Sequence, residues 1–64
     1  MQNELNTLMS EMNLEFHNAT VENEKFSNGN NSAGTRLRKH MQNLKNLAQR
    51  VRTEVQSQKN AVTA

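Results

Sequence analysis

The sequence predicts an all-α protein: an antiparallel two-helix hairpin that dimerises into a four-helix bundle. Apolar residues recur at steps of three, four and seven through both halves of the chain, which is the spacing of one helix face. A single cluster of helix-breaking residues, SNGNNS at 27–32, separates the halves. Only 33% of the 64 residues are hydrophobic and none is cysteine, so a second copy is the stabiliser that the composition leaves available.

Residues 1–28 are predicted to form an acidic amphipathic helix. A strand would need apolar and polar residues to alternate, and this stretch does not alternate. Leu14 and Val21 lie off the apolar stripe, where they face water or serve a second chain. The stripe itself consists of Leu5, Leu8, Met9, Met12, Phe16, Ala19 and Phe26.

Residues 29–31 are predicted to be the turn. Gly29 can adopt the left-handed conformation that closes a helix, so we expect it to have a positive φ. One of Asn30, Asn31 and Ser32 is then expected to cap the next helix by accepting backbone N–H bonds. A connection this short makes the two helices antiparallel neighbours.

Residues 32–57 are predicted to form a basic amphipathic helix, and residues 58–64 a disordered C-terminus. Gly34 costs about 1 kcal/mol relative to alanine in a helix, unless a neighbour must approach closely there. The side formed by Leu44, Leu47 and Val51 is wider than one helix covers, which also favours a dimer. The full stripe is Ala33, Leu37, Met41, Leu44, Leu47, Ala48, Val51 and Val55.

The net charge of +2 conceals a division between the two halves. Up to residue 28 there are five acids and one base, a net charge of 1 − 5 = −4. From residue 29 onward there are seven bases and one acid, a net charge of 7 − 1 = +6. This asymmetry predicts two helices that attract each other and leave a surplus of positive charge.

The bases of the second helix divide into two rows. The first row recurs every seven residues and flanks the apolar seam: Arg38, Lys45, Arg52 and Lys59. In a hairpin centred on the turn, this row is predicted to pair with the acidic helix, Arg38 with Glu22 or Glu24 and Lys45 with Glu15. The second row is Arg36, Lys39 and Arg50. It is predicted to point away from the seam with no acid within reach, beside Asn43 and Asn46, as a phosphate-contacting surface would. A merely soluble outer face is the alternative.

Several classes of site are not expected. The spacing from Gly29 to Thr35 is similar to a phosphate-binding loop, but the required lysine and preceding strand are missing. His17 and His40 lie one in each helix, and we expect both to be solvated rather than to share a metal. No catalytic arrangement has a rigid scaffold, so no enzyme, cofactor or small-molecule substrate is predicted. No signal peptide or membrane span is predicted either, which favours a cytoplasmic protein.

Two motifs carry a family resemblance. The segments Gly29-Asn30-x-x-Ala33-Gly34-Thr35-Arg36-x-Arg38-Lys39 and Ala48-Gln49-Arg50-Val51-Arg52-Thr53-Glu54 resemble the bacterial linker-histone-like nucleoid proteins, best known from chlamydiae. The resemblance is to a short member without the long Lys-rich tail. It implies a DNA-compacting, histone-like protein of the nucleoid that organises the chromosome without sequence preference. It also implies two DNA-contacting clusters, one of Arg36, Arg38 and Lys39 and one of Arg50 and Arg52.

The predicted function is therefore sequence-nonspecific binding of double-stranded DNA by a homodimer, through backbone phosphates. The alternative is a small coiled-coil interaction module whose basic helix docks an acidic helix of another protein. Phosphate binding weakens steeply with salt, whereas helix docking survives moderate salt through apolar burial. Whether DNA is bent, bridged or coated, and whether RNA competes, stays open. The candidate DNA-binding residues are Arg36, Arg38, Lys39, Lys45, Arg50 and Arg52.

Overall fold

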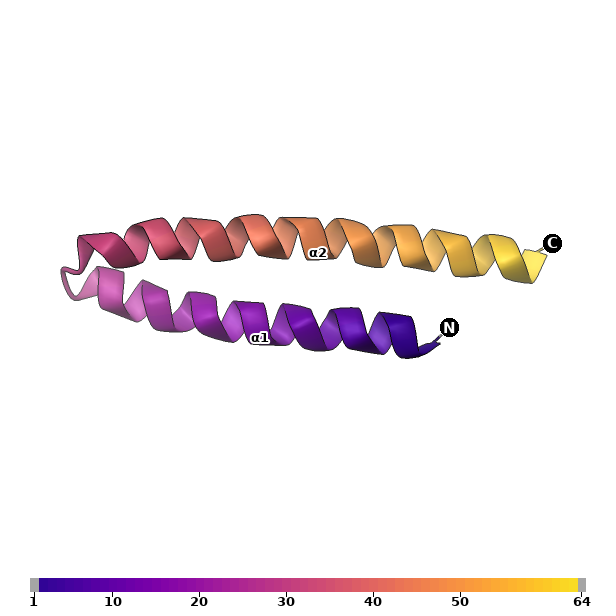
Figure 1. The fold of residues 1–64 in the computed structure, drawn as a ribbon, viewed down its shortest axis with the longest axis horizontal. Coiled ribbons are helices and arrows are strands. Elements are labelled where there is room, and N and C mark those ends of the chain that lie inside the picture. Colours follow the sequence, from indigo (N-terminus) through magenta and orange to yellow (C-terminus); the bar gives the residue numbers. More distant parts are fainter. Residues whose placement is uncertain (1, 64) are drawn as a thin grey trace.

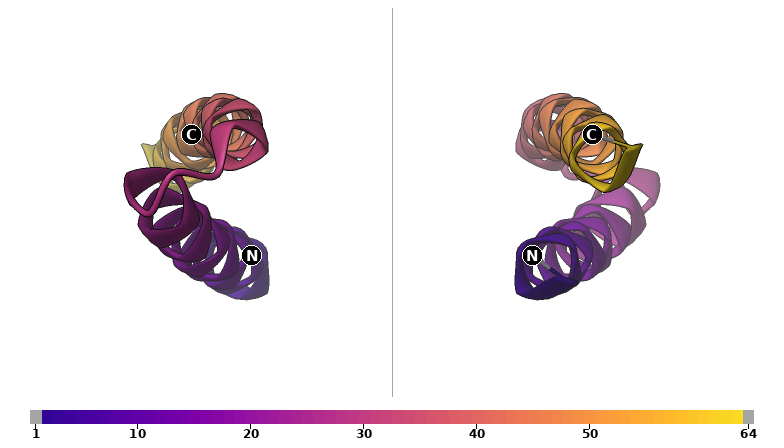
Figure 2. Two further views of the ribbon diagram at one scale, coloured as in Figure 1. Left: turned by 90° about the vertical axis from the view of Figure 1, so that its left-hand side faces the viewer. Right: turned by 90° about the vertical axis from the view of Figure 1, so that its right-hand side faces the viewer.

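Two antiparallel helices joined by a tight turn make up the fold. A computed structural model describes residues 2–63 of the backbone and the side chains of residues 4–61. Helix α1 spans Gln2–Ser27 and helix α2 spans Asn31–Thr63, and they run side by side as a rod of 54 × 15 × 10 Å (Figure 1). The end-on views show α1 inclined to α2, so the helices cross as they pass each other (Figure 2). The predicted all-α hairpin is confirmed.

The turn closes α1 through a glycine in the left-handed region. Gly29 has a φ of 102°, as predicted. The N–H of Asn30 donates to the Lys25 carbonyl at 3.0 Å, and that of Gly29 donates to the Phe26 carbonyl at 3.0 Å. These two bonds satisfy carbonyls that the helix end would otherwise leave unpaired. Asn30 then caps α2, because its Oδ1 accepts the N–H of Ala33 at 3.3 Å.

Gly34 is explained by a close neighbour across the turn. A Cβ atom at this position would lie 2.7 Å from Cε1 of Phe26, closer than two carbon atoms approach without displacement. The Phe26 ring therefore packs directly on the backbone of the first turn of α2. This is the condition under which a glycine was expected to be tolerated there.

Helix α2 is longer than the sequence pattern predicts. It continues through residues 58–63, where disorder was expected; Ala64 lies outside the described residues. Side-chain hydrogen bonds four residues apart support this extension. Gln56 Nε2 donates to Asn60 Oδ1 at 3.1 Å, and Gln58 Nε2 donates to Glu54 Oε2 at 3.1 Å. The extension carries α2 past the start of α1 (Figure 1).

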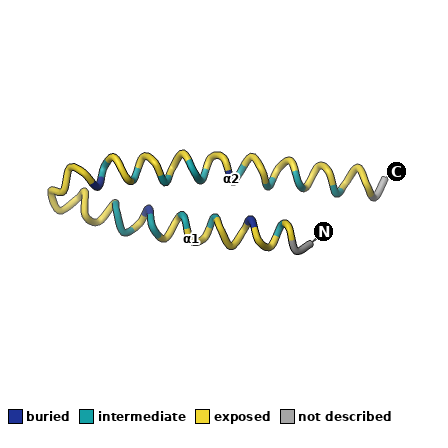
Figure 3. The backbone as a smooth tube through the Cα atoms, in the orientation of Figure 1, coloured by how far each residue is buried: buried dark blue, intermediate teal, exposed yellow. Residues whose placement is uncertain are grey.

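The seam between the helices is narrow, and only alanine and leucine side chains are buried in it. Its buried residues are Leu8, Ala19, Ala33 and Leu47, on the sides of the helices that face each other (Figure 3). Of the three residues predicted to form a side wider than one helix covers, Leu47 is buried, whereas Leu44 and Val51 are only half-buried, so part of that apolar width remains uncovered. The exposed large apolar residues lie one position further round each helix, and include Met9, Phe16 and Met41.

Candidate nucleic-acid interface

The two sides of the seam differ in chemistry. At 100° per residue, α2 positions three after a seam residue lie on one side of the seam, and positions one or four after it lie on the other. The first side is polar, and we call it the polar flank: Glu11, Glu15 and Glu22 of α1 with Arg36, His40, Asn43 and Arg50 of α2. The second side is an apolar groove: Met9, Met12 and Phe16 of α1 with Leu37, Met41, Leu44 and Ala48 of α2.

Near the turn, the polar flank is closed by an ion pair. Arg36 Nε donates to Glu22 Oε1 at 2.9 Å. This hydrogen bond holds the pKa of the Glu22 carboxyl below its ordinary value, with the charge of Arg36 adding to the effect and desolvation opposing it. The arginine is therefore engaged within the hairpin.

Midway along the hairpin, Glu15 collects two donors from α2. His40 donates from Nδ1 to Glu15 Oε1, and Asn43 donates from Nδ2 to the same oxygen at 3.1 Å. The hydrogen bond from His40, then that from Asn43, lower the pKa of the Glu15 carboxyl. All three side chains are partly buried. The expectation that His40 is a solvated surface residue is therefore wrong, since it joins the two helices.

Towards the open end of the hairpin, the polar flank loosens. Arg50 Nη1 lies 4.0 Å from Glu11 Oε2, and both side chains are about half exposed. Such an exposed, long contact contributes little to stability, because water screens it and two long side chains must be held in place. Arg50 is thus only weakly held by its acid.

The predicted pairing of the two basic rows is reversed at four residues, whereas Lys39 pairs with no carboxylate of residues 4–61, as predicted. Arg36 and Arg50, expected to have no acid within reach, contact Glu22 and Glu11. Arg38 and Lys45, expected to pair with Glu22 or Glu24 and with Glu15, pair with no carboxylate of residues 4–61. The physical reason is the crossing of the helices: the α1 acids lie on one side of its stripe, which meets the side of α2 bearing Arg36, Asn43 and Arg50. The spacing of seven between Glu15 and Glu22, matched by the same spacing among Arg36, Asn43 and Arg50, is the sequence signal that was missed.

The outward surface of α2 has a row of cations and no acid. Arg38, Lys45 and Arg52 recur every seven residues and are all exposed; we call them the outer cation row. Lys39, also exposed, lies about 100° round the helix from Arg38, on the side of the polar flank, and its charge helps to lower the pKa of Glu15. Glu54 is the one acid in the sequence of α2, and it is half-buried. The six candidate residues therefore divide into two that are paired and four that are not.

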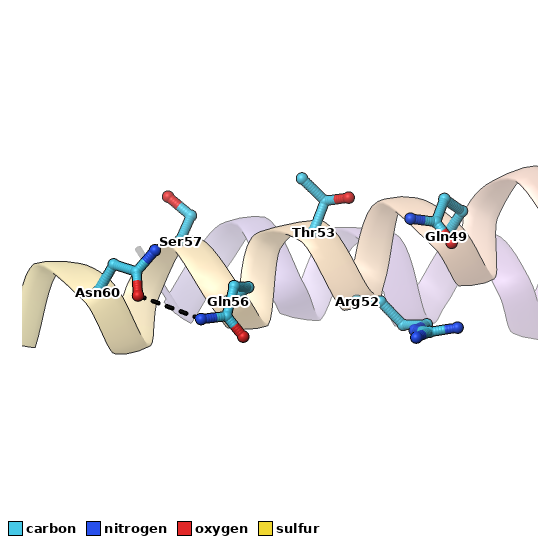
Figure 4. Close-up of a pocket in the computed structure, with 6 residues that line it drawn as sticks. All are labelled: Gln49, Arg52, Thr53, Gln56, Ser57 and Asn60. Carbon is cyan, nitrogen blue, oxygen red and sulfur yellow. Dashed lines mark hydrogen bonds between the residues drawn. The ribbon is translucent and has the colours of Figure 1, made fainter.

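Uncharged polar side chains fill the rest of this surface. Figure 4 shows one stretch of it, where six residues of α2 line a shallow, open depression: Gln49, Arg52, Thr53, Gln56, Ser57 and Asn60. Another amide pair lies earlier on the helix, where Gln42 Nε2 donates to Asn46 Oδ1 at 3.5 Å. Cations among amide and hydroxyl groups can bind an extended anion, because each group donates hydrogen bonds.

The apolar groove contains two neighbouring hollows. Phe16 and Met41 line both of them, so these two side chains stand between the hollows. Ala19 and Leu37 line the hollow nearer the turn, and Ala48 lines the other. On the groove's edges, the α1 residues Asn13 and Thr20 are uncharged, whereas α2 contributes Lys45.

Among the described residues, no group of three or more His, Cys, Asp or Glu side chains could hold a metal ion. Neither helix, over the same residues, is long and apolar enough to cross a membrane.

Comparison with known proteins gives one match. A family model described as histone H1-like protein Hc1 matches residues 6–61. The match covers most of α1, the turn and most of α2, more than the stretch from Gly29 to Glu54 on which the resemblance was based. Neither the curated proteins nor the solved structures contain a significant match to the chain.

Proposed function

Because the chain belongs to the histone H1-like protein Hc1 family, we propose that it is a nucleoid protein that binds double-stranded DNA as a homodimer, without sequence preference, through backbone phosphates. This family is one of histone-like proteins and not of enzymes. Cytoplasm and nucleoid are accordingly the proposed location. The observation that carries the phosphate contacts is the acid-free outward surface of α2 with its outer cation row.

The geometry of the outer cation row suits a linear polyanion. Seven residues of α-helix rise about 10.5 Å, so the charges of Arg38 and Arg52 are about 21 Å apart along the axis. Duplex DNA carries one negative charge per about 1.7 Å of its length, so every cation of a row this long has phosphates within reach. The side chains are long and exposed, and a small shift of register costs them little. Contacts of this kind carry no sequence information, because phosphate is the same at every step.

The remaining three candidates have subordinate roles in this proposal. Lys39 is exposed and pairs with no carboxylate of residues 4–61, but it lies about 100° round α2 from Arg38, so a duplex bound by the outer cation row is not expected to contact it. Arg50 can leave its 4.0 Å contact with Glu11 at little cost. Arg36 is bound to Glu22 at 2.9 Å, and a phosphate must compete with that carboxylate for it. We therefore expect the outer cation row to contribute most to DNA affinity and Arg36 to contribute least.

Salt dependence tests the phosphate contacts directly. Fluorescence anisotropy with two unrelated duplexes should give equal affinities at each salt concentration. Three phosphate contacts predict that log affinity falls with log salt at a slope of about −3 for each duplex bound by one α2 surface. A variant with Arg38, Lys45 and Arg52 all changed to Ala should lose most of that slope and weaken both duplexes equally. Binding that differs strongly between the duplexes, or a slope the triple variant leaves unchanged, would overturn the proposal.

One observation favours a second candidate function, docking of another protein. The apolar groove is open, and Phe16 is 61% exposed in it. A module that docks an apolar helix there would have an affinity nearly independent of salt, because apolar burial drives it. If the parent protein shows no salt-dependent DNA binding at all, this second function takes the place of the first.

A further inference from the structure

We propose that the apolar groove receives the same groove of a second copy, with α2 of each copy packed beside α1 of the other. In this arrangement the two outer cation rows lie on opposite faces of the dimer, and one dimer joins two DNA duplexes. The inference rests on the proposed homodimer and on the proposed phosphate binding. It adds the surface that joins the copies, their relative orientation and the bridging of DNA.

The hairpin exposes enough surface for a second copy to cover part of it. Its accessible surface is 5018 Å², whereas a folded monomer of the same mass exposes about 4,200 Å². The excess of about 800 Å² equals the area that each protein of a standard interface contributes. The narrow seam leaves that area uncovered, and a second copy would cover it.

The composition of the groove selects a second copy over a charged partner. Three large apolar side chains, Met9, Phe16 and Met41, are exposed there, and Lys45 is the single charged residue lining the two hollows. An acidic helix would therefore find one cation in the groove, while its acids would lose water. An identical groove supplies apolar side chains without acids. The polar flank cannot serve the same purpose, because its groups are already bonded to one another.

The edges of the groove decide the orientation. The α2 edge carries Lys45, which is in line with the rest of the outer cation row at steps of seven, whereas the α1 edge carries the uncharged Asn13 and Thr20. Two copies can meet with α2 beside α1 or with α2 beside α2. The second choice places Arg38, Lys45 and Arg52 of both copies along one line, where like charges repel. The first choice places each cationic edge against an uncharged one, and is favoured.

The favoured orientation has a functional consequence. When α2 of each copy lies beside α1 of the other, the two α2 helices are diagonal across a four-helix bundle. Their outward surfaces then point in opposite directions. A single duplex can touch one of them, so the second remains available for another duplex. The dimer thus bridges DNA and does not wrap it.

The first test compares two equally exposed residues. Phe16 in the groove is 61% exposed and Leu14 outside it is 63% exposed, so the isolated hairpin predicts that both tolerate aspartate equally. We expect Phe16→Asp to halve the mass found by sedimentation equilibrium, from twice 7.3 kDa to that of one chain. Leu14→Asp should leave it unchanged. A monomeric parent would overturn the second copy and leave the groove to another protein. Dissociation by Leu14→Asp alone would move the interface to the other side.

The second test reads the orientation through disulfide formation, since the chain has no cysteine of its own. Asn13 and Lys45 line the same hollow from opposite edges. Mixing the single variants Asn13→Cys and Lys45→Cys under mild oxidation should produce the mixed disulfide dimer. Gln42 lies on the outward surface, so the control variant Gln42→Cys should form neither a symmetric disulfide dimer nor a mixed one with Asn13→Cys. A disulfide formed only between two Lys45→Cys chains would overturn the orientation.

The third test measures bridging and separates the two proposals. Immobilised duplex should capture a second, labelled duplex when the parent is added, and Phe16→Asp should abolish capture while still binding single duplexes. The salt slope should stay near −3 for one duplex, whereas cation rows on one shared face would give about −5. A parent protein that binds no DNA at all would refute the proposed function. A dimer that binds DNA with the steeper slope and captures no second duplex would refute the bridging alone.

Discussion

The two basic rows can be compared in a matched pair of variants that remove equal charge. The first double variant, Arg38→Gln with Lys45→Gln, removes two cations that pair with no carboxylate of residues 4–61. The second, Arg36→Gln with Arg50→Gln, removes the two cations that contact acids. Each double variant lowers the formal net charge from +2 by two, to 2 − 2 = 0. Any difference in DNA binding between them therefore reports geometry and not net charge.

The expected magnitude follows from the number of phosphates released. Losing two contacts reduces the slope of log affinity against log salt by about 1.8. Between 50 and 200 mM salt, the affinity of the parent should then fall about twelvefold more than that of the Arg38/Lys45 variant. The Arg36/Arg50 variant should keep nearly the slope of the parent. It should instead melt at a lower temperature, because Glu22 and Glu11 lose the cations beside them.

The assay is fluorescence anisotropy of a random-sequence duplex across a salt series, with circular dichroism melts of both variants. Helicity at the assay temperature serves as the control, since an unfolded variant would lose DNA binding for the wrong reason. The reasoning is refuted if the Arg36/Arg50 variant flattens the slope as much as the other. In that case DNA would have to break the ion pairs of the polar flank on binding.

Three further predictions concern stability. Gly29→Val should lower the free energy of unfolding by about 1 kcal/mol or more, because φ is 102°; an unchanged melt would contradict the turn. Gly34→Ala should stabilise the protein by less than the ~1 kcal/mol that alanine offers in a helix, because its Cβ would meet the Phe26 ring. The full stabilisation should appear when Phe26 is also changed to Ala. Equal stabilisation with and without the Phe26 ring would exclude the contact. The lowered pKa of Glu15 means that the unfolded chain binds a proton more readily than the folded one, so its stabilising contribution is lost as pH falls below the ordinary value of 4.5. The melting temperature should fall more steeply in that acidic range for the parent than for Glu15→Gln, and parallel curves would show that the carboxylate plays no part.

Local chemistry accounts for the parts of the fold that were predicted correctly. The positive φ of Gly29 follows from the need to end a helix, and the cap by Asn30 follows from the unpaired N–H groups at the start of the next one. Gly34 in a first turn indicated a close neighbour, though which residue approaches could not be read from spacing. The end of α2 was predicted too early, because the apolar stripe was used to mark it. Polar pairs such as Gln56 and Asn60 can extend a helix where no apolar residue is left to pack.

The candidate site was only half predictable for a different reason. Helical spacing identifies which residues share a face, and it correctly placed Arg38, Lys45 and Arg52 in one row. It does not say which side of that row meets the other helix. That choice depends on how two helices cross, and an error of one position exchanges the paired and unpaired cations. The same limit hid His40 and Asn43, since a polar residue in a seam is recognised only when its acceptor, here Glu15, is known.

The hairpin, its turn, the separation of acidic from basic helix and the resemblance to histone-like proteins could therefore be predicted from the chain alone. These features depend on residues within a few positions of one another, or on the net charge of each half of the chain, which does not depend on geometry. The assignment of charges to surfaces, in contrast, depends on how the helices pack: two of the six candidate cations lie with their acids on the polar flank, apolar side chains line the groove, and the outer cation row pairs with no carboxylate of residues 4–61. The physical reason is that an ion pair between helices requires side chains within about 4 Å. A rotation of one helix by a single residue moves them out of that range.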